Sequence, residues 1–597
     1  MTVAAQLRAR ATDDRPGLWR VEDDGTAAPG HPPAPTTAWT WREVVQECAV
    51  RAAWMTSVAA TGRTASESCE RVRPPQPSEP SDTRPLHVGV LLDNVPELVF
   101  LLGGAALSGS VIVALNTTRS AAELAGDAAR ADCDLLVTEP GHLDLAEGLR
   151  EHAADAAAEG GTAAGITVLD AESTDYRERL APYTGAPLPD TDAIADETLL
   201  MLIFTSGTSG RPRAVRVTHR KVTVPGEHLA GRLLTGDDAV YCPMPLFHSG
   251  AVMAAYAPAL AAGARLVVRR RFSASGLLPD VRRHGCTYLH YVGKALSYVL
   301  GTPERADDRD NPLRVAFGNE AAPLEQEAFA ERFGCVVVDA YGSTETAISL
   351  SPDPFGPPGA LGTLPDGVKV LDPRTGEECP PARLDDAGRV LNADEAVGEL
   401  VNTGDLGLFD GYYNEDAADR LRDGMFWSGD HVYADENGHV FFVGRSLDRL
   451  RVDGENFGSV QVERALATAP GVQRIAVYGV PDAASGDQVM AAVVGDFDPE
   501  AFGAYLRSRA DLSSKWMPRY VRVTTELPAT ASNKILKRRL AETGWRTRDP
   551  VWWRPGREPA YRRLTPEDAT RLREEFERRG RLHLLADRSE AHEGTDR

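Results

Sequence analysis

A loop between two short strands constrains this chain more than any other stretch. Leu202-Ile203-Phe204 is an apolar run typical of a buried strand, and Ala214-Val215-Arg216-Val217 resumes extended structure. The loop itself consists of Thr205, Ser206, Gly207, Thr208, Ser209, Gly210, Arg211, Pro212 and Arg213. Glycines let the backbone approach a polyanion, while backbone N–H groups, hydroxyls and guanidinium groups bind its oxygens. We therefore predict a phosphate-binding loop in a strand–loop–strand unit.

This loop differs from a Walker motif, because no Gly-Lys-Ser/Thr sequence ends it and no helix start follows it. A flexible Ser/Gly turn between two strands is the alternative interpretation. The run Thr205–Gly210 favours phosphate binding, because so many successive hydroxyl and glycine residues are unusual in a plain turn.

Length and charge limit the classes of protein that the sequence can encode. A chain of 597 residues is too long for one core, so two or more domains are expected. A net charge of −22 without a long Lys/Arg run argues against nucleic-acid or anionic-membrane partners, but not against ATP. The seven scattered cysteines form no C-x-x-C pair. With no leader and no apolar run of about eighteen residues, these features indicate a cytoplasmic protein without a transmembrane segment.

The order of the expected elements indicates a mainly parallel sheet in the first half of the chain. Residues His87–Leu115 read as a β-α-β unit. Later strands end in glycine-rich or polar turns, as at Val315–Phe317 and Val336–Asp339. Ligands gather at such carboxyl ends in open α/β sheets. From about Leu361, short alternating strands predict a smaller β subdomain.

An ordered set of motifs resembles the adenylate-forming superfamily of acyl-CoA synthetases, luciferases and peptide-synthetase adenylation domains. The set comprises Thr205–Arg213, Tyr341–Glu345, Trp427-Ser428-Gly429-Asp430 and Lys534. The likeness covers roughly residues 38–545. Three further stretches look most like the very-long-chain acyl-CoA synthetase and fatty-acid-transport-protein branch and its actinobacterial relatives. They are Gly318-Asn319-Glu320-Ala321-Ala322-Pro323, Gly454-Glu455-Asn456 and Trp552-Trp553.

The resemblance implies four regions with α/β and α+β architecture. Residues 1–37, before the stretch that the resemblance covers, are expected to be a flexible N-terminus because of their Ala/Pro/Asp-rich composition. Residues 38–444 would form a large ATP- and substrate-binding domain of mixed sheets flanked by helices, together with the β subdomain. The Ser/Pro/Glu-rich residues 62–83 would be a disordered insertion in it. Residues 445–545 would be a small mobile C-terminal domain, and residues 546–597 a C-terminal extension.

The resemblance also implies roles in the activation of a carboxylic acid by ATP. The phosphate loop, Thr205–Gly210 with Arg213, would hold the β- and γ-phosphates. Glu345 would bind Mg²⁺, which prefers hard carboxylate oxygens, and Thr344 would contact the α-phosphate. Lys534 would stabilise the charge that builds between the carboxylate and the α-phosphate. The expected catalytic residues are therefore Lys534, Glu345 and Thr344.

Further residues would hold the nucleoside. Tyr341 and the turn Gly318, Asn319, Glu320 and Ala321 would face the adenine. Asp430 would accept hydrogen bonds from both ribose hydroxyls, assisted by Arg445. Rotation of the small domain about a hinge near Arg445–Arg449 would withdraw Lys534 and bring Gly454 to the thiol channel. His248 lies where relatives place an aromatic residue or a histidine at the acyl tunnel, and a packing histidine is the alternative.

The chain departs from the family's pattern at the hinge and at the phosphate loop. Leu447 replaces the hinge aspartate, and Arg451 stands for the usual lysine. Arg213 replaces the common phosphate-loop lysine, which keeps the charge but changes its geometry. These departures leave the expected adenylation residues intact. The departures at the hinge concern the second half-reaction, the transfer to the thiol, and the departure at Arg213 concerns how this residue acts on the phosphates.

The main hypothesis is an ATP-dependent acyl-CoA synthetase. It would adenylate a fatty or aryl acid, release pyrophosphate and transfer the acyl group to CoA, with ATP, Mg²⁺, CoA and a small-molecule acid as ligands. One alternative keeps the adenylation chemistry but activates nitrite for diazotization of an aryl amine, or transfers the acyl group to a carrier-protein thiol. Another is a catalytically silent ligand-binding relative, against which Lys534, Glu345 and Asp430 argue. The acid, the final acceptor and the oligomeric state stay open at this point.

Overall fold

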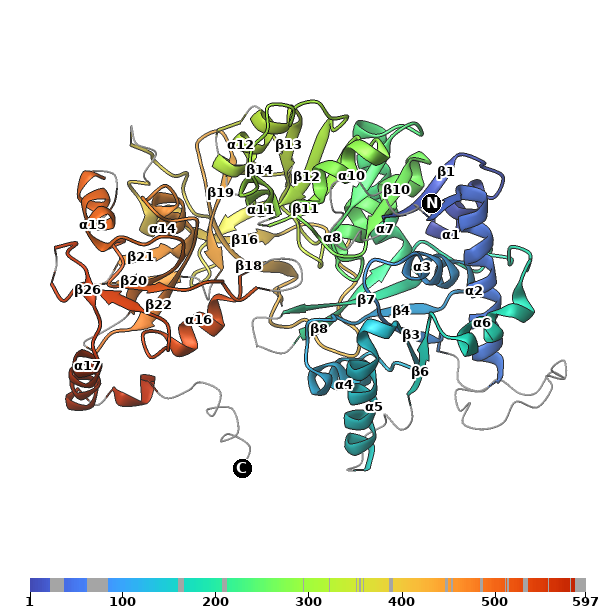
Figure 1. Cartoon of the computed structure of the whole chain (residues 1–597), viewed down its shortest axis with the longest axis horizontal. Helices are drawn as coiled ribbons and strands as arrows, with labels where there is room; N and C mark the ends of the chain where they lie inside the picture. Colours follow the sequence, from blue (N-terminus) through green and yellow to red (C-terminus); the bar gives the residue numbers. More distant parts are fainter. Residues whose placement is uncertain are drawn as a thin grey trace. The chain divides into compact units, whose positions relative to one another are not determined.

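The computed structural model of the chain forms two compact units, which are described separately (Figure 1). The N-terminal unit contains Met1–Ser349 and Leu406–Ala418, and the C-terminal unit contains Leu350–Asp405 and Asp419–Arg597. The domain boundary expected between residues 444 and 445 stays a prediction. The structure describes residues 1–21, 37–61, 84–158, 166–206, 212–293, 295–321, 323–350, 352–353, 356–357, 359–385, 390–445, 449–452, 455–483, 487–509, 512, 515–529, 535–556, 558–579 and 581–585.

The first sheet of the N-terminal unit carries the phosphate-loop strands at one edge. Its six strands have the order β6-β5-β3-β4-β7-β8, and all neighbours are parallel except β7 and β8. Helices α3 Pro96–Ser108, α4 Ala121–Arg130 and α5 Leu143–Ala158 make the crossovers that parallel pairing requires. The strands are β3 His87–Leu91, β4 Val111–Ala114, β5 Leu135–Thr138, β6 Thr167–Asp170, β7 Leu199–Ser206 and β8 Pro212–Thr218. The predicted β-α-β unit is therefore confirmed.

The second sheet of this unit brings three strand ends of the expected adenine site together. Its order is β13-β12-β11-β9-β10-β1-β2, and all neighbours are parallel except β1 and β2. The strands are β1 Pro16–Val21, β2 Thr37–Thr40, β9 Ala239–Cys242, β10 Arg265–Arg269, β11 Tyr288–Val292, β12 Val315–Asn319 and β13 Val336–Asp339. Because β11, β12 and β13 are adjacent and parallel, their carboxyl ends lie side by side.

Local sequence explains where helix α2 of this unit begins. Helix α2, Trp41–Thr61, begins after Thr40, whose Oγ1 accepts from the backbone N–H of Glu43 at 3.2 Å while Glu43 accepts in return. The remaining helical segments are α6 Thr174–Leu180, α7 His219–Leu233, α8 Ser249–Ala251, α9 Ala257–Ala262, α10 Leu277–His284, α11 Ala295–Leu300, α12 Pro323–Phe333, the 3-10 turns η1 Pro140–His142 and η2 Ala181–Tyr183, and the π-helix η3 Val252–Tyr256.

The expectation of a flexible N-terminus over residues 1–37 is wrong for residues 1–21. Residues Val3–Ala9 form helix α1, in which Val3 and Leu7 are fully buried. Residues Pro16–Val21 form β1, which pairs with β10 on one side and with the edge strand β2 on the other. The Ala/Pro/Asp-rich composition suggested disorder, but it did not reveal this buried apolar face. Residues 22–36 lie outside the described residues, as does the expected insertion at 62–83.

His219 makes the docking of α1 sensitive to pH. Its Nδ1 accepts a hydrogen bond from the backbone N–H of Val3 at 3.2 Å, and burial lowers its pKa to about 4. The unfolded imidazole gains a proton near pH 6.5, whereas the folded one gains it only near pH 4. The stabilisation is therefore complete above pH 6.5 and is lost as the pH falls towards 4. At pH 5 we expect a loss of about 2 kcal/mol from this residue.

The variant His219→Asn tests this linkage, because asparagine keeps a hydrogen-bond acceptor but does not titrate. We expect its stability, measured by thermal unfolding at pH 7 and pH 5, to fall less between these pH values than that of the natural protein. Other buried histidines contribute equally to both proteins. Parallel pH profiles for the two proteins would contradict the role given to His219.

The C-terminal unit contains the predicted β subdomain. Its six-stranded sheet has the order β14-β19-β18-β16-β15, with β17 paired to β18. The strands are β14 Ala360–Thr363, β15 Val368–Leu371, β16 Gly398–Asn402, β17 Leu421–Arg422, β18 Met425–Ala434 and β19 His439–Arg445. All its pairs are antiparallel, so short connections suffice. Short alternating strands correctly predicted this sheet.

A second sheet in the C-terminal unit is covered by helices on both faces. Its order is β22-β23-β24-β25-β26. Val477 packs with Val462 and Phe502 of the helices on one face, and its neighbour Tyr478 packs with Leu540 and Phe576 on the other. The remaining elements of the C-terminal unit, in and outside this sheet, are α13 Ala393–Ala396, β20 Arg449–Val452, β21 Glu455–Gly458, α14 Ser459–Leu466, β22 Arg474–Pro481, β23 Asp487–Val494, α15 Pro499–Ser508, β24 Tyr520–Val523, α16 Lys537–Thr543, β25 Val551–Trp553, β26 Arg562–Arg563, α17 Pro566–Arg578 and η5 Leu582–Leu585.

The residues after Trp545 contribute to this second sheet. Trp552 and Trp553 lie in β25, which pairs with β24, and their rings pack into the two cores. Helix α17 begins after the N-cap Thr565, which forms a capping box with Asp568.

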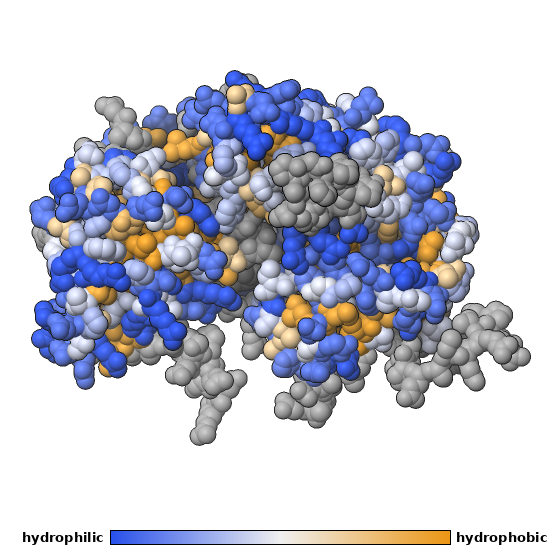
Figure 2. Space-filling model, viewed as in Figure 1, coloured by the Kyte–Doolittle hydropathy of each residue, from blue (hydrophilic) through white to orange (hydrophobic). Residues whose placement is uncertain are grey.

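The surface shown in Figure 2 is mostly hydrophilic, with apolar side chains in separate patches. Within the described part of the chain, no helix has the length and apolar character needed to cross a membrane. The prediction of no transmembrane segment is consistent with this result.

Candidate functional site

The strands β7 and β8 hold both ends of the predicted phosphate loop. Thr205 pairs with Arg213, and Ser206 pairs with Pro212, so the strand–loop–strand prediction is confirmed. The loop residues Gly207, Thr208, Ser209 and Gly210 lie outside the described residues. Thr205 and Arg213 therefore mark the point at which the chain leaves the sheet and returns to it.

Thr205 and Glu345 meet although 140 residues separate them. The Thr205 hydroxyl donates to Oε1 of Glu345 at 3.4 Å, and the Tyr412 hydroxyl donates to the same oxygen at 3.1 Å. The ammonium of Lys221 donates to the backbone carbonyl of Glu345 at 2.8 Å, and burial lowers the pKa of Lys221 to about 8. The structure thus fixes both the backbone and one carboxylate oxygen of the expected magnesium ligand.

Sequence reasoning missed Tyr412 and Lys221. Tyr412 lies in Gly411-Tyr412-Tyr413-Asn414, a turn-like stretch without an obvious chemical pattern. Lys221 is fully buried, which is rare for a lysine. The local sequence held no signal for either residue, since Lys221 stands directly after His219 and Arg220.

The expected α-phosphate residue Thr344 lies beside the start of helix α8. Its hydroxyl is 2.9 Å from that of Ser249, so the two share a hydrogen bond. His248 precedes Ser249, and burial lowers the pKa of its imidazole to about 4. The Nε2 atom of His248 is buried and has no hydrogen-bond partner among the described residues. A neutral imidazole therefore stands next to Ser249 at neutral pH.

The expected adenine turn follows β12 and is tied to both neighbouring strands. The carboxylate of Asp339 accepts from the Tyr291 hydroxyl at 2.8 Å and from the backbone N–H of Ala321 at 2.9 Å. Burial raises the pKa of Asp339 to about 7. Glu320 has a φ of 65°, which gives the turn its sharp direction. These contacts place Gly318, Asn319, Glu320 and Ala321 at the carboxyl ends of β11, β12 and β13.

Tyr341 follows the end of β13 by two residues and is half-buried. The backbone N–H of Ala340, next to it, donates to the carbonyl of Gly318 at 2.8 Å. This bond places the start of the Tyr341 segment beside the carboxyl end of β12, and the role of Tyr341 towards the adenine stays a prediction.

The expected ribose residues lie in the C-terminal unit. Asp430 is in β18 and pairs with Arg445 in β19, so their backbones are opposite each other. Gly429 before it has a φ of 75°, and its N–H donates to Glu399 at 2.6 Å. Burial raises the pKa of Glu399. The positive φ favours glycine at position 429, whereas a Cβ there would meet only the guanidinium end of the flexible Arg420 side chain.

Several other predicted residues lie wholly or partly outside the described residues. Lys534, Gly454 and Leu447 lie outside the described residues, and for Arg445 and Arg451 only the backbone is described. Their roles stay predictions.

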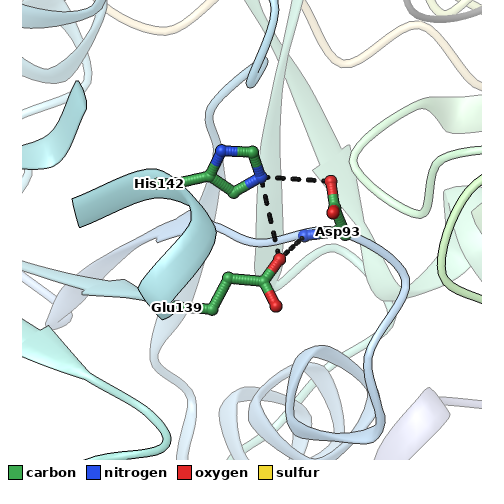
Figure 3. A group of neighbouring side chains, drawn as sticks. All are labelled: Asp93, Glu139 and His142. Atoms are coloured by element: carbon green, nitrogen blue, oxygen red, sulfur yellow. Dashed lines mark hydrogen bonds and ion pairs between the residues drawn. The ribbon is translucent and has the colours of Figure 1, made fainter. Parts of the chain in front are cut away.

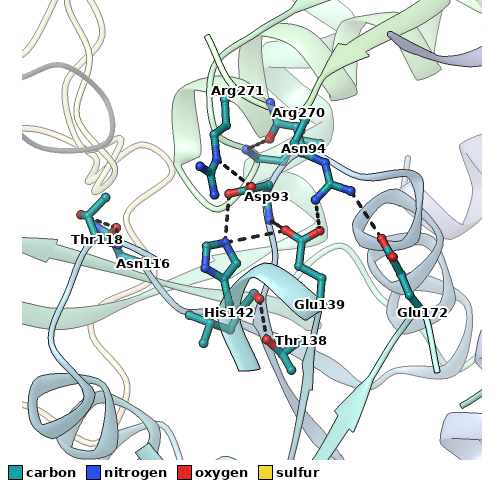
Figure 4. Close-up of polar contacts among 12 residues, drawn as sticks. Asp93, Asn94, Asn116, Thr118, Thr138, Glu139, His142, Glu172, Arg270 and Arg271 are labelled. Carbon is teal, nitrogen blue, oxygen red and sulfur yellow. Dashed lines mark hydrogen bonds and ion pairs between the residues drawn. The ribbon is translucent and has the colours of Figure 1, made fainter. Parts of the chain in front are cut away.

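One other polar cluster in the N-terminal unit has the residue types of a metal site (Figure 3). Asp93, Glu139 and His142 are buried, and Nε2 of His142 is 3.1 Å from Asp93 and 3.7 Å from Glu139. Arg271 pairs with Asp93 at 2.9 Å, and Arg270 with Glu139 at 2.5 Å (Figure 4). Two guanidinium groups thus balance the two carboxylates and would repel a cation. We interpret the cluster as a structural ion-pair network that joins β3, η1 and the end of β10.

A family model for the AMP-binding enzyme matches residues 82–413, and a second one, for the AMP-binding enzyme C-terminal domain, matches residues 461–534. Steroid-22-oyl-CoA synthetase of Rhodococcus jostii is 43% identical over 98% of this chain and 99% of its own length. The medium/long-chain-fatty-acid–CoA ligase FadD17 of Mycobacterium tuberculosis is 45% identical over 79% of this chain and 89% of its own.

Solved structures have the same fold at lower identity. ATP-bound MatB from Rhodopseudomonas palustris superposes with a TM-score of 0.71 at 23% identity, covering 91% of this chain and 99% of MatB. The anthranilate CoA ligase AuaEII in complex with anthranoyl-AMP gives 0.70 at 19% identity, covering 92% and 98% of the two chains. They support the predicted fold class of mixed sheets with a β subdomain and a C-terminal domain. The chain therefore belongs to the AMP-binding enzyme family and, within it, to the ATP-dependent acyl-CoA ligases.

Proposed function

We propose that this acyl-CoA ligase activates the carboxylate of a bulky, apolar acid, with a steroid side-chain acid as its preferred substrate class. The observation that carries this proposal is the extent of similarity to the R. jostii steroid-22-oyl-CoA synthetase, which covers 98% of this chain. The similarity to the fatty-acid ligases covers only 79%. The steroid acid thus replaces the fatty or aryl acid of the sequence-based hypothesis as the first choice, within the same actinobacterial branch.

The segment after His248 supports an apolar substrate. Residues Ser249–Ala262 contain no charged side chain and are rich in alanine. They include the π-helix Val252–Tyr256, which is buried and to which the Tyr288 hydroxyl donates at Ala254. Single π-helical turns are frequent at functional sites. An apolar acyl group that contacts this segment would bind in a favourable apolar environment. A charged group in the same place would lose its hydration without a compensating partner.

The proposed first half-reaction is attack of the acid's carboxylate on the α-phosphorus of ATP, with release of pyrophosphate. Both reactants are anions, so the site must align them and neutralise charge. The phosphate loop and Thr344 would orient the phosphates, and Lys534 would act on the carboxylate and the α-phosphate. Asp430 and the Gly318 turn would hold the nucleoside. The acyl group then passes to the CoA thiol, and AMP leaves.

Glu345 suits the proposed magnesium ion. Its Oε1 accepts two hydrogen bonds, while its Oε2 accepts none from the described residues. A carboxylate with one oxygen held and the other available is an appropriate hard ligand. The bound ion would neutralise phosphate charge.

The experiment compares acids at fixed ATP, Mg²⁺ and CoA. A steroid-22-oic acid, cholic acid, lauric acid, palmitic acid and benzoic acid are each assayed for pyrophosphate release and for consumption of free CoA thiol. We expect the steroid-22-oic acid to give a kcat/KM at least about tenfold above that of the fatty acids, because partly filled apolar pockets lose binding energy. A rigid ring system also loses little conformational entropy on binding.

A fatty acid as the best substrate would disprove the steroid preference and leave the enzyme class unchanged. The same assay with nitrite or without CoA checks the alternatives: pyrophosphate release with every acid but no thiol consumption would indicate another acceptor. No release with any acid would support a silent relative.

A further inference from the structure

We propose that Arg213 and Tyr412 are positioning residues for the Glu345 carboxylate, so that the phosphate-loop arginine of this chain acts on Mg²⁺–nucleotide binding through Tyr412. This inference rests on the proposed role of Glu345 as the magnesium ligand. It assigns a function to the replacement of the usual phosphate-loop lysine by Arg213.

Strand β8 holds the backbone of Tyr412 in a fixed register. Tyr412 forms an antiparallel bridge with Val215. On either side of this bridge, the N–H of Arg216 donates to Gly411 at 3.1 Å, and the N–H of Tyr413 donates to Ala214 at 2.8 Å. The segment Leu406–Ala418, to which Tyr412 belongs, is part of the N-terminal unit. Strand β8, which starts where the phosphate loop ends, therefore also fixes the position of Tyr412.

Arg213 contacts the Tyr412 side chain in two ways. Its guanidinium carbon lies 3.9 Å from the centre of the phenol ring, and its Nη2 donates to the phenol oxygen at 3.1 Å. Both side chains are buried, so this stacking takes place in a medium of low dielectric constant. A lysine has no planar group to stack in this way.

The donors and acceptors in the contacts from Arg213 through Tyr412 to Glu345 can be assigned in only one way. An arginine can only donate and a carboxylate can only accept. The Tyr412 hydroxyl must therefore accept from Arg213 and donate its single proton to Oε1 of Glu345, at 3.1 Å. The positive charge of Arg213 polarises the hydroxyl and strengthens this second bond.

Two other contacts limit how much Tyr412 contributes. Thr205 donates to the same oxygen at the longer distance of 3.4 Å, and Lys221 holds the backbone carbonyl of Glu345. Loss of the Tyr412 hydroxyl would thus leave Glu345 near its place but free to turn about its side-chain bonds. We expect a weaker metal site and no loss of the fold.

The experiment measures ATP binding calorimetrically at a series of Mg²⁺ concentrations, without acid or CoA. For Tyr412→Phe we expect the Mg²⁺ concentration of half-maximal enhancement to rise about tenfold, the size of one hydrogen bond to a charged group. Binding of ATP in EDTA should not change. Tyr413→Phe is the matched control, because its hydroxyl donates to Asp132 at 2.9 Å, away from Glu345.

Arg213 is tested by a double-mutant cycle. Arg213→Gln should raise the half-maximal Mg²⁺ concentration in the natural background but should add little in the Tyr412→Phe background. Arg213→Lys should raise the half-maximal Mg²⁺ concentration by an intermediate amount, because lysine keeps the positive charge but lacks the planar guanidinium group. Additive effects of Arg213→Gln and Tyr412→Phe would mean that Arg213 acts on the phosphates directly, which would overturn the proposal.

If Tyr412→Phe has the same Mg²⁺ dependence of ATP binding as the natural protein, the proposed positioning role is overturned as well. Glu345→Gln separates this outcome from a failure of the proposed function. If Glu345→Gln weakens the Mg²⁺ dependence and Tyr412→Phe does not, only the positioning role is wrong. If neither variant changes it, Glu345 is not the magnesium ligand.

Discussion

Lys534→Ala is expected to lower the rate of adenylation by about a hundred- to a thousandfold, the effect of removing one donor from a preorganised charge-stabilising site. The physical reason is that the ammonium would stabilise negative charge that builds between the acid's oxygen and the α-phosphate. Pyrophosphate release under single-turnover conditions measures this first step. Transfer from synthetic acyl-AMP to CoA measures the second, which should continue at a rate close to that of the natural protein.

Lys537→Ala is the control for this substitution. The Lys537 ammonium donates to Ser459 at 2.8 Å and pairs with Glu463 at 3.0 Å, so its role within the C-terminal unit is structural. We expect this variant to keep both half-reactions. Equal loss of both steps in Lys534→Ala would count against the role of Lys534 in adenylation.

Gly318→Ala is expected to destabilise the N-terminal unit by about 3 kcal/mol, the upper range for overpacking. A Cβ atom at this position would overlap the backbone carbonyl oxygen of Tyr291 and would lie 2.7 Å from two ring atoms of Tyr291. Gly318 and Tyr291 are direct partners in the parallel pair β11–β12. The Tyr291 ring cannot swing away freely, because its hydroxyl is bound to Asp339. Relief of the overlap therefore requires the two strands to separate.

Thermal unfolding and ATP binding measure this effect. A fall in the apparent Tm of roughly 5 °C is expected, with weaker ATP binding if the turn that begins at Gly318 holds the adenine as proposed. Gly231→Ala is the matched control: Gly231 is exposed in helix α7 and has open space around its Cα, so alanine should be neutral or stabilising by up to about 1 kcal/mol. An unchanged Tm for Gly318→Ala would contradict the close strand approach.

The sequence predicted several local elements and the fold class. The strands on both sides of the phosphate loop depend on short apolar and β-branched runs, and these formed as expected at β7 and β8. Helix starts at Thr40 and Thr565 were predictable because a capping box involves residues only three positions apart. The motif order also gave the correct fold class, since the family relation holds along most of the chain.

Errors and omissions arose where distant parts of the chain decide the outcome. Composition suggested disorder before residue 38, but α1 is ordered because Val3 and Leu7 find a buried surface and Val3 binds His219. The buried Lys221 is another example, because its two acceptors are the carbonyls of Arg216 and Glu345. Such partners depend on how sheets and helices pack, which local patterns do not specify.

The sequence by itself determined which groups the predicted phosphate loop offers: hydroxyls and glycines that suit an anion, and the positive charge of Arg213. Only the tertiary structure decided what Arg213 contacts. Tyr412 is 199 residues away along the chain and reaches Arg213 because its segment pairs with β8. A charge is a property of one residue, whereas a hydrogen-bonded stack needs two side chains at a fixed distance, and only the folded sheet provides that distance.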